Sequence, residues 1–293
     1  MIIDIHTHTF PEKIAKKALD KLSQGSNMPY FLNGSLSDLQ RSMEENKIDY
    51  SVLLPVATSP AQYATINQTA IEINDCWKET GILSFGGIHP CNENYKEIIN
   101  HLCENGVRGI KIHPVFQDVP IDDIRYLRLI SYASERGLVI VTHAGFDVGF
   151  PGVEHSLAPH ISSMLKQVQP QKMVLAHMGG WGDWDNVEEL LCDYPIWMDT
   201  AFTLPPIAHL KTPDPKKAPW KPQQEQLTYT QFNRIVDSLG AERILFGSDS
   251  PWSSQGASLS YLKQALSDTP DLYPKISGEN AAALLGINGS GRL

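Results

Sequence analysis

The sequence predicts an α/β fold, a closed (β/α)8 barrel that forms a single domain over residues 1–293. Three observations lead to this prediction. Short apolar runs alternate with helical patterns, eight such runs occur, and most of them have a polar residue at or just after their C-terminal end. Eight strand–helix units close most simply into a parallel barrel, and such barrels place their active sites at the carboxyl ends of the strands.

The apolar runs are nearly continuous, as is typical of strands that are buried on both faces of a parallel sheet. They lie at residues 2–8, 50–56, 82–90, 109–114, 138–145, 173–180, 196–202 and 243–252. An open doubly wound sheet would show a Gly-rich phosphate-binding turn after its first strand. The HTHTFPEK segment at that place is no such turn, so the closed barrel is preferred.

The segments between the runs carry helical patterns. In DDIRYLRLISYASERG, four apolar residues at helical spacing are expected to face the barrel, namely Ile124, Leu127, Ile130 and Ala133. Gly137 then provides a helix end before the next strand. The irregular, proline-rich segment at residues 203–226 is predicted to be a long loop over the barrel mouth.

Composition and charge narrow the class of protein. With 42% hydrophobic and 19% charged residues, the chain can bury a large core. The formal net charge of -9 argues against nucleic acid as a partner and favours a small-molecule substrate. The four cysteines form no CxxC pair, and neither a signal peptide nor an apolar run of about 20 residues is found. We therefore expect a cytoplasmic protein without a membrane partner, and a homodimer is an open alternative.

Polar residues at the strand ends indicate a metal site. Residues two apart in a strand project to the same face, so His6 and His8 can chelate one ion. Alone, such a pair could equally be two hydrogen-bonded histidines at a strand end. However, His143 ends the fifth run, His177 the sixth and Asp249 the eighth, which makes coincidence a poor explanation.

A divalent ion such as zinc takes about four nitrogen or oxygen ligands and, in catalytic sites, keeps one position open for water. His6, His8, His143 and Asp249 would meet this need. The ion would lower the pKa of bound water to about 7 and polarise a carbonyl group. Asp249 is then the natural carrier of the proton, and His177 would stabilise developing charge or orient the water.

Six segments carry a resemblance to a known family: HTHTFP, GVRGIKIHPVFQ, VTHAG, LAHMGG, ILFGSDSPW and SGENAAALL, in this order. They resemble the amidohydrolase-2 group of the amidohydrolase superfamily, TIM-barrel metal-dependent enzymes that include aminocarboxymuconate semialdehyde decarboxylase, hydroxybenzoate decarboxylases and lactonases. The resemblance implies one Zn²⁺ held by His6, His8, His143 and Asp249, with His177 catalytic and not bound to metal. Mn²⁺ or a second metal ion is the alternative cofactor.

Lys111 leaves the number of metal ions open. In binuclear members of the superfamily a fourth-strand lysine is carboxylated and bridges two ions, GIKIHP resembles that strand, and His177 would then be a ligand of the second ion. The preferred alternative is that Lys111 pairs with an acidic residue or a substrate carboxylate inside the barrel. His113 would face the same side, and both are candidates for second-metal or substrate binding. His89 could also reach the mouth, or it could be a turn histidine before Pro90.

Aromatic residues follow the site residues along the chain and could form the walls of a pocket for a flat or apolar substrate. They are Phe146, Phe150, Trp181, Trp184 and Trp252, of which Trp181 and Trp252 are the substrate-binding candidates. For each one, simple packing over the barrel end is an equal alternative.

The function predicted is that of a metal-dependent hydrolase that cleaves an ester, lactone or amide bond through metal-activated water. The alternative is a lyase, a non-oxidative decarboxylase of a small aromatic or unsaturated carboxylic acid, in which Asp249 or His177 protonates carbon. A TatD-type nuclease would need a metal-binding glutamate where this chain has Lys111. The intact set of ligands also argues against a non-catalytic binding protein on the same scaffold.

Overall fold

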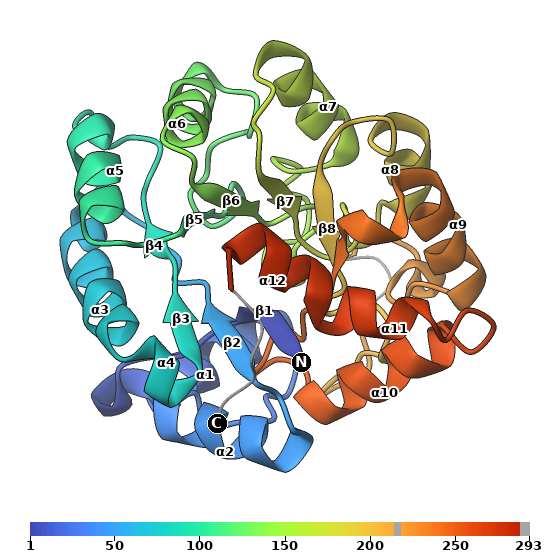
Figure 1. Cartoon of the computed structure of the whole chain (residues 1–293). Helices are drawn as coiled ribbons and strands as arrows, with labels where there is room; N and C mark the ends of the chain where they lie inside the picture. The colour runs from blue at the N-terminus through green and yellow to red at the C-terminus, as the bar shows by residue number, and fades with distance from the viewer. Residues whose placement is uncertain (214–217, 288–293) are drawn as a thin grey trace.

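The computed structural model describes residues 1–213 and 218–287. Its strands form a closed parallel barrel surrounded by helices (Figure 1), as predicted. The strands are β1 (Ile3–Thr7), β2 (Tyr50–Leu53), β3 (Ile82–Ser84), β4 (Gly86–Gly87), β5 (Gly109–Ile112), β6 (Val139–Thr142), β7 (Met173–Leu175), β8 (Trp197–Asp199) and β9 (Ile244–Leu245). Because β3 and β4 are separated by Phe85 alone, they occupy one position of the barrel.

Neighbouring strands pair in chain order, with β1 to β3 in one sheet and β4 to β9 in the other. Backbone hydrogen bonds join the two sheets on both sides. Phe85 N donates to Leu53 O across the β3–β4 break, and Ile5 N donates to Phe246 O on the side of β9. A parallel bridge between Thr7 and Ser250 continues this second junction, so the barrel is closed.

The helices surround the strands (Figure 1). They are α1 (Glu12–Ser26), α2 (Leu36–Asn46), α3 (Tyr63–Asp75), α4 (Trp77–Thr80), α5 (Tyr95–Glu104), α6 (Ile124–Glu135), α7 (Ala158–Gln167), α8 (Trp184–Leu190), α9 (Tyr229–Leu239), α10 (Gln255–Ala265), α11 (Leu272–Pro274) and α12 (Asn280–Leu285). None of the helices in the described part of the chain is long and apolar enough to cross a membrane.

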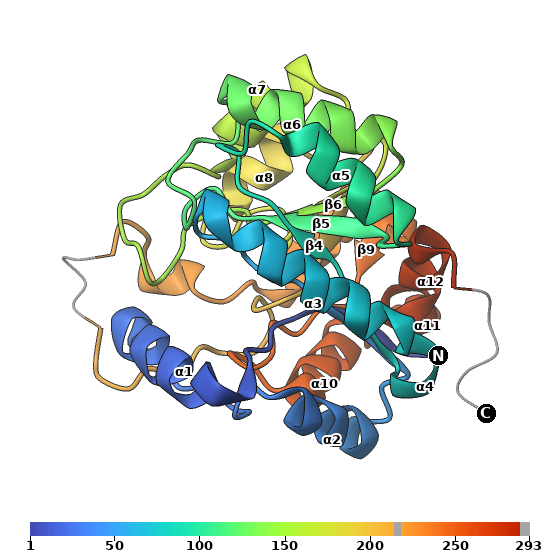
Figure 2. The same ribbon diagram turned by 90° about the vertical axis from the view of Figure 1, so that its left-hand side faces the viewer.

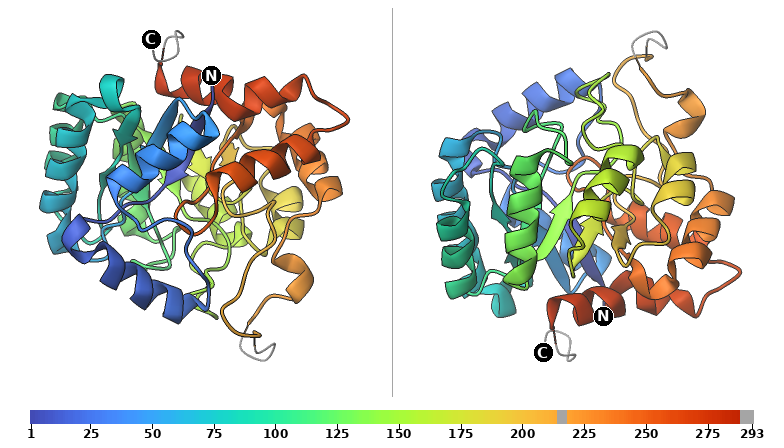
Figure 3. Two further views of the ribbon diagram at one scale, coloured as in Figure 1. Left: turned by 90° about the horizontal axis from the view of Figure 1, so that it is seen from below. Right: turned by 90° about the horizontal axis from the view of Figure 1, so that it is seen from above.

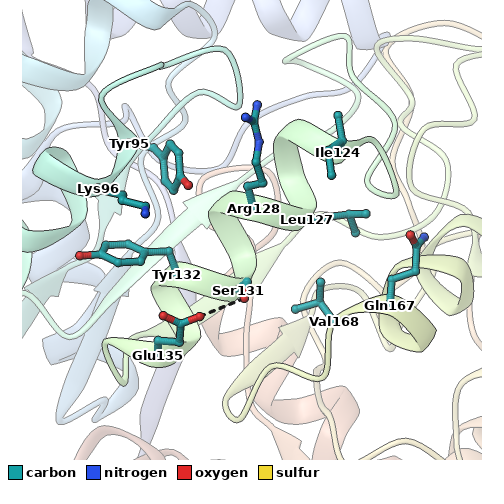
Figure 4. Close-up of a pocket in the computed structure, with 10 residues that line it drawn as sticks. All are labelled: Tyr95, Lys96, Ile124, Leu127, Arg128, Ser131, Tyr132, Glu135, Gln167 and Val168. Atoms are coloured by element: carbon teal, nitrogen blue, oxygen red, sulfur yellow. Dashed lines mark hydrogen bonds between the residues drawn. The ribbon is translucent and has the colours of Figure 1, made fainter.

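Helix α6 shows how the amphipathic pattern works and where it fails. The carboxylate of Asp123 caps its first turn by accepting from Arg125 N. Leu127, Ile130 and Ala133 are buried as predicted, but Ile124 is 62% exposed, so that part of the prediction is wrong. Ile124 is the first residue of the helix, and it lies at the rim of an outer groove between α5, α6 and α7 (Figure 4). None of the residues that line this groove belongs to the predicted site.

Alternation along the strands decides which side chains enter the barrel. In β5, Ile110 and Ile112 pack in the core under the helices, so Lys111 and His113 face the barrel interior. In β1 the register shifts between Asp4 and Thr7, because one extra residue opposes β2. Such a bulge changes the direction of the side chains that follow it, and it lies where the HTH motif begins.

The two ends of the barrel differ. Helix α12 and the N-terminus lie at one end, whereas α1 and the described parts of the segment from β8 to α9 lie at the other (Figures 2 and 3). Apolar residues of α12, Ala281, Leu284 and Leu285, join the inner core of Ile3 and Val139 and cover the first end. The carboxyl ends of the parallel strands therefore open at the end where the long connecting segments lie.

Candidate metal centre

His6, His8 and Asp249 form a tight group at the carboxyl ends of β1 and β9. Their ligand atoms all lie within 4.8 Å of one another. The Asp249 Oδ1 atom is 3.0 Å from His8 Nε2 and 3.5 Å from His6 Nε2. Backbone bonds from Asp249 N to His6 O and from His8 N to Ser250 O hold the two segments together. Three of the four predicted ligands are thus brought to one point.

Hydrogen bonds fix the orientation of both imidazole rings. His8 Nδ1 lies 2.9 Å from the Leu54 carbonyl oxygen and His6 Nδ1 lies 2.8 Å from the Asp199 carboxylate. Both partners accept, so each Nδ1 carries a hydrogen and each Nε2 points toward Asp249. Burial keeps the pKa of His6 well below its usual range, so this ring is neutral.

The donor set fits a divalent cation. The Nε2 atoms of two imidazoles and a carboxylate oxygen converge, and when both rings are neutral at Nε2 these three acceptors repel one another unless a positive charge lies between them. Burial raises the pKa of Asp249, but the contacts with His8 and the neighbouring His6 outweigh it and bring the pKa to about 2. A single proton can satisfy one pair of these acceptors, whereas one divalent ion satisfies all three.

Asp199 was not predicted as a site residue. It ends β8 and is fully buried. One carboxylate oxygen accepts from His6 Nδ1, and the other accepts from the backbone N–H groups of His177 and Ala201 at 3.0 Å. Burial raises its pKa, while His177, these N–H groups and Lys111 oppose the rise. Asp199 is the polar residue near the end of the seventh apolar run, at residues 196–202. The pattern that indicated His143, His177 and Asp249 would therefore also have indicated Asp199.

His143 and His177 lie beside the tight group and contact each other. His177 Nδ1 lies 2.9 Å from the Ala201 carbonyl oxygen, and its Nε2 lies 3.1 Å from His143 Nδ1. His143 Nε2 is buried and has no hydrogen-bond partner among the described residues. His143 is therefore next to the three-residue group rather than inside it, and the pKa of each ring is lowered by burial.

Backbone conformation marks the same positions. Asp249 has φ of 64°, His177 has 60° and Met178 has 51°. Residues other than glycine seldom adopt this left-handed region, and such outliers collect at functional sites, where the surrounding structure holds them. The two residues predicted to be catalytic are thus held in an unfavourable backbone geometry.

Lys111 points into the barrel next to the group. Its side chain is 1% exposed, and its Nζ atom lies 3.5 Å from His6 Nε2. Burial lowers the pKa of Lys111 to about 8, opposed by Asp199, Asp249 and Asp147. Among the described residues no carboxylate oxygen lies within ion-pair distance of this amine, so the predicted pairing with an acidic residue of the barrel is not found.

His113 and Asp147 form a second group with His143. The His113 and His143 rings are stacked, with centroids 4.2 Å apart and 8° between their planes. Lone pairs in two parallel planes do not converge on one ion between them, so this arrangement favours packing or substrate contact over a second metal. His89 is buried, and its Nδ1 accepts from Cys91 N, which is the turn-histidine alternative.

A family model identifies the family of this chain. The model described as Amidohydrolase, of the amidohydrolase-2 group, matches residues 3–287. The chain belongs to the amidohydrolase family. A search of curated proteins gave no similar sequence.

Solved structures share the fold of this amidohydrolase. An amidohydrolase from Burkholderia multivorans with bound zinc is 15% identical with a TM-score of 0.66, covering 98% of this chain and 100% of that one. 5-Carboxyvanillate decarboxylase from Sphingomonas paucimobilis is 13% identical with a TM-score of 0.60, covering 98% and 99%. A probable 2-pyrone-4,6-dicarboxylic acid hydrolase from Acinetobacter baumannii with citric acid bound is 14% identical with a TM-score of 0.61, covering 98% and 99%. At these identities the likeness establishes the TIM barrel.

The tryptophans near the site differ in their contacts and in their burial. Trp184 is buried under the site and donates from Nε1 to the His177 carbonyl oxygen, which is a structural contact. Trp181 is 2% exposed, and its indole Nε1 has no partner among the described residues. Trp220 of the 203–226 segment packs on Trp181 with ring centroids 5.0 Å apart. Trp252 is half-buried, and its backbone N–H donates to Asp249 O.

Proposed function

We propose that this amidohydrolase is a metal-dependent hydrolase that cleaves an ester, lactone or amide bond of a small molecule, with one Zn²⁺ as its ion and the cytoplasm as its compartment. The observation that carries the proposal is the convergence of His6 Nε2, His8 Nε2 and Asp249 Oδ1. His143 is the fourth ligand in this proposal, because it lies next to the group and its buried Nε2 has no hydrogen-bond partner among the described residues. A divalent ion at this place supplies an activated water and polarises a carbonyl group.

Residues of the chain would then transfer the proton, orient the water and exclude bulk solvent. Asp249 is ionised at neutral pH and can accept a proton from water and return it to the leaving group. His177 is neutral, and because its Nδ1–H donates to Ala201 O, its Nε2 is an acceptor, which lies 3.1 Å from His143 Nδ1 at the edge of the site. It would orient the water rather than bind the metal. Trp181, Phe202 and Trp220, which pack together, would exclude bulk solvent from one side.

The same site supports a second candidate, a decarboxylase of a small aromatic or unsaturated acid. The observation that favours it is Lys111, a buried cation next to the ligand His6, which could hold an acid group. The likeness in fold to 5-carboxyvanillate decarboxylase is consistent with this candidate but does not select it. The two candidates differ in the bond that breaks, so product analysis separates them.

A substrate screen with metal-loaded protein tests the proposal. We expect about one equivalent of zinc per chain by elemental analysis, and hydrolysis of at least one lactone, ester or amide. Release of CO2 from aromatic or unsaturated acids, without hydrolysis, would replace the leading candidate by the second. Protein that neither retains nor takes up a divalent ion would contradict both.

A further inference from the structure

A single buried side chain, that of Gln117, joins three of the segments that follow the barrel strands. Gln117 lies in the turn after β5 and is 3% exposed. Its Nε2 atom donates to Ala57 O at 2.8 Å and to Ile88 O at 2.7 Å. Its Oε1 atom accepts from His113 N at 2.9 Å and from the hydroxyl group of Tyr126 on α6. Both hydrogens and both lone pairs of the carboxamide group are therefore used.

These four contacts fix the carboxamide group in position and in orientation. Its nitrogen faces two carbonyl oxygens and its oxygen faces two donors, so the reverse orientation would place donors against donors and acceptors against acceptors. Buried polar networks in which every group is satisfied are rigid. The backbone N–H of Gln117 also donates to His113 O at 2.9 Å, which closes the turn between the two residues.

The contacts of Gln117 begin where the pairing of the strands ends. The pairing of β2 with its neighbour ends at Leu53, and that of β4 ends at Gly87. The carbonyl groups of Ala57 and Ile88, which accept from Gln117, come after these residues in the chain. Gln117 therefore continues the hydrogen bonding between neighbouring segments past the ends of these strands.

The segment after β2 orients a predicted metal ligand. Leu54 O accepts from His8 Nδ1 at 2.9 Å, and Ala57 follows Leu54 by three residues. Pro55, which lies between them, restricts the backbone. A shift of the segment at Ala57 would therefore also move the carbonyl group that holds the ring of His8.

The segment after β5 contacts another predicted ligand. The ring of His113 is stacked on the ring of His143, with centroids 4.2 Å apart. Gln117 bonds both the backbone N–H and the backbone carbonyl group of His113. Because stacked rings restrict each other's rotation, the position of His113 limits the directions in which His143 can point.

We infer that Gln117 is a positioning residue for the metal centre. It acts on His8 through the segment after β2 and on His143 through the ring of His113. The inference rests on the proposed function, because it requires that these two histidines bind the ion. Gln117 itself is not a ligand, since its four hydrogen-bonding positions are occupied within the chain.

Replacement of Gln117 tests the inference without turnover. Gln117→Met keeps the length of the side chain and removes all four hydrogen bonds of the carboxamide group. We expect its zinc affinity to fall about 10-fold, because groups that hold ligand histidines in place contribute at least this much to metal affinity. Competition with a coloured chelator measures the affinity. The visible absorption spectrum of the Co²⁺-loaded protein reports the geometry of the ligands and should change as well.

Two further variants keep the experiment decisive. Gln117→Glu keeps the shape of the side chain but cannot donate to both Ala57 O and Ile88 O, so it should also weaken zinc binding if Gln117→Met does not fold. Asn67→Leu is the matched control, because Asn67 of α3 is also buried and accepts from Gly87 N of β4. This control should lower the melting temperature and leave zinc affinity and the cobalt spectrum unchanged.

The outcomes separate the inference from the proposed function. A folded Gln117→Met variant with unchanged zinc affinity and an unchanged cobalt spectrum would overturn the inference. Equal losses of zinc affinity in Gln117→Met and Asn67→Leu would also overturn it, because general stability would then explain both. Zinc binding that depends on Gln117, together with no hydrolysis in the screen, would instead remove the hydrolase proposal and leave the role of Gln117 standing. An unaltered protein that binds no divalent ion would overturn both.

Discussion

The Asp199 carboxylate lies 2.8 Å from His6 Nδ1, and this bond turns the Nε2 lone pair of His6 toward His8 and Asp249. A carboxylate behind a ligand histidine fixes the tautomer and orientation of the ring and raises its basicity. The same carboxylate accepts from His177 N, so it also supports the strained residue that faces the site. One buried side chain thus positions two of the predicted functional residues.

Replacement of Asp199 tests this relationship. Asp199→Ala should weaken zinc affinity about 10- to 100-fold, because the ring of His6 can turn and its tautomer is no longer fixed. Zinc competition with a coloured chelator measures the affinity. Asp183→Ala is the matched control, since Asp183 is also buried but accepts from Ala158 N and Asn186 Nδ2, neither of which belongs to the metal centre. Unchanged zinc affinity in Asp199→Ala would show that Asp199 has only a structural role.

His177 and Asp249 are predicted to have separate roles. His177→Asn should keep its metal and lower kcat by about 10²- to 10⁴-fold, the typical contribution of a positioned acid or base. Asp249→Ala removes a ligand and a proton carrier, so both metal content and kcat should fall. The double variant should cost less than the product of the two effects, because the residues act on the same step. If His177→Asn loses its metal as completely as Asp249→Ala does, His177 is a ligand.

Asp4 predicts a pH dependence of stability. Burial raises its pKa to about 6, although Ser248, Gln255 and His6 N donate to it. The folded protein then holds this proton more tightly than the unfolded chain, so the contribution is present at low pH and is lost as the pH rises through about 6.

Unfolding in urea of metal-free protein at pH 5 and pH 8 measures this effect. The destabilisation caused by Asp4→Asn should be larger at pH 5 than at pH 8 by about 1 kcal/mol, since one unit of pKa corresponds to about 1.4 kcal/mol. Asp237→Asn removes a charge at an exposed position and is the control. An equal effect of Asp4→Asn at both pH values would mean that the pKa of Asp4 is not raised.

Gly145 lets the segment after β6 lie close to the segment after β7. It has φ of 94°, and an added Cβ would lie 2.1 Å from Trp181 N. Gly145→Ala should therefore destabilise the fold by about 2–4 kcal/mol, through strain and a backbone clash together. Gly152→Ala separates the two causes, because Gly152 has φ of 89° with nothing within 4 Å of the added Cβ. Similar losses in both variants would show that the clash is relieved at little cost.

Much of the barrel can be predicted from local pattern. The eight apolar runs, the helix at residues 124–135 and the polar residues at the strand ends are local properties of the chain. The exposure of Ile124 could not be predicted in this way, because helical spacing does not tell where along its length a helix leaves the barrel. The placement of Asp199 behind His6 is likewise a contact between residues 193 positions apart.

The sequence by itself determined the fold class and the residue types that gather at the carboxyl ends of the strands, because parallel strands bring those ends together whatever their order in the chain. Only the tertiary structure decided which of these residues contact one another. It placed His6, His8 and Asp249 in one tight group, paired His143 with His177, and left Lys111 buried without a carboxylate partner. The physical reason is that tautomers, lone-pair directions and the desolvation of a charge depend on neighbouring residues from several strands. A local sequence pattern does not contain information on these neighbours.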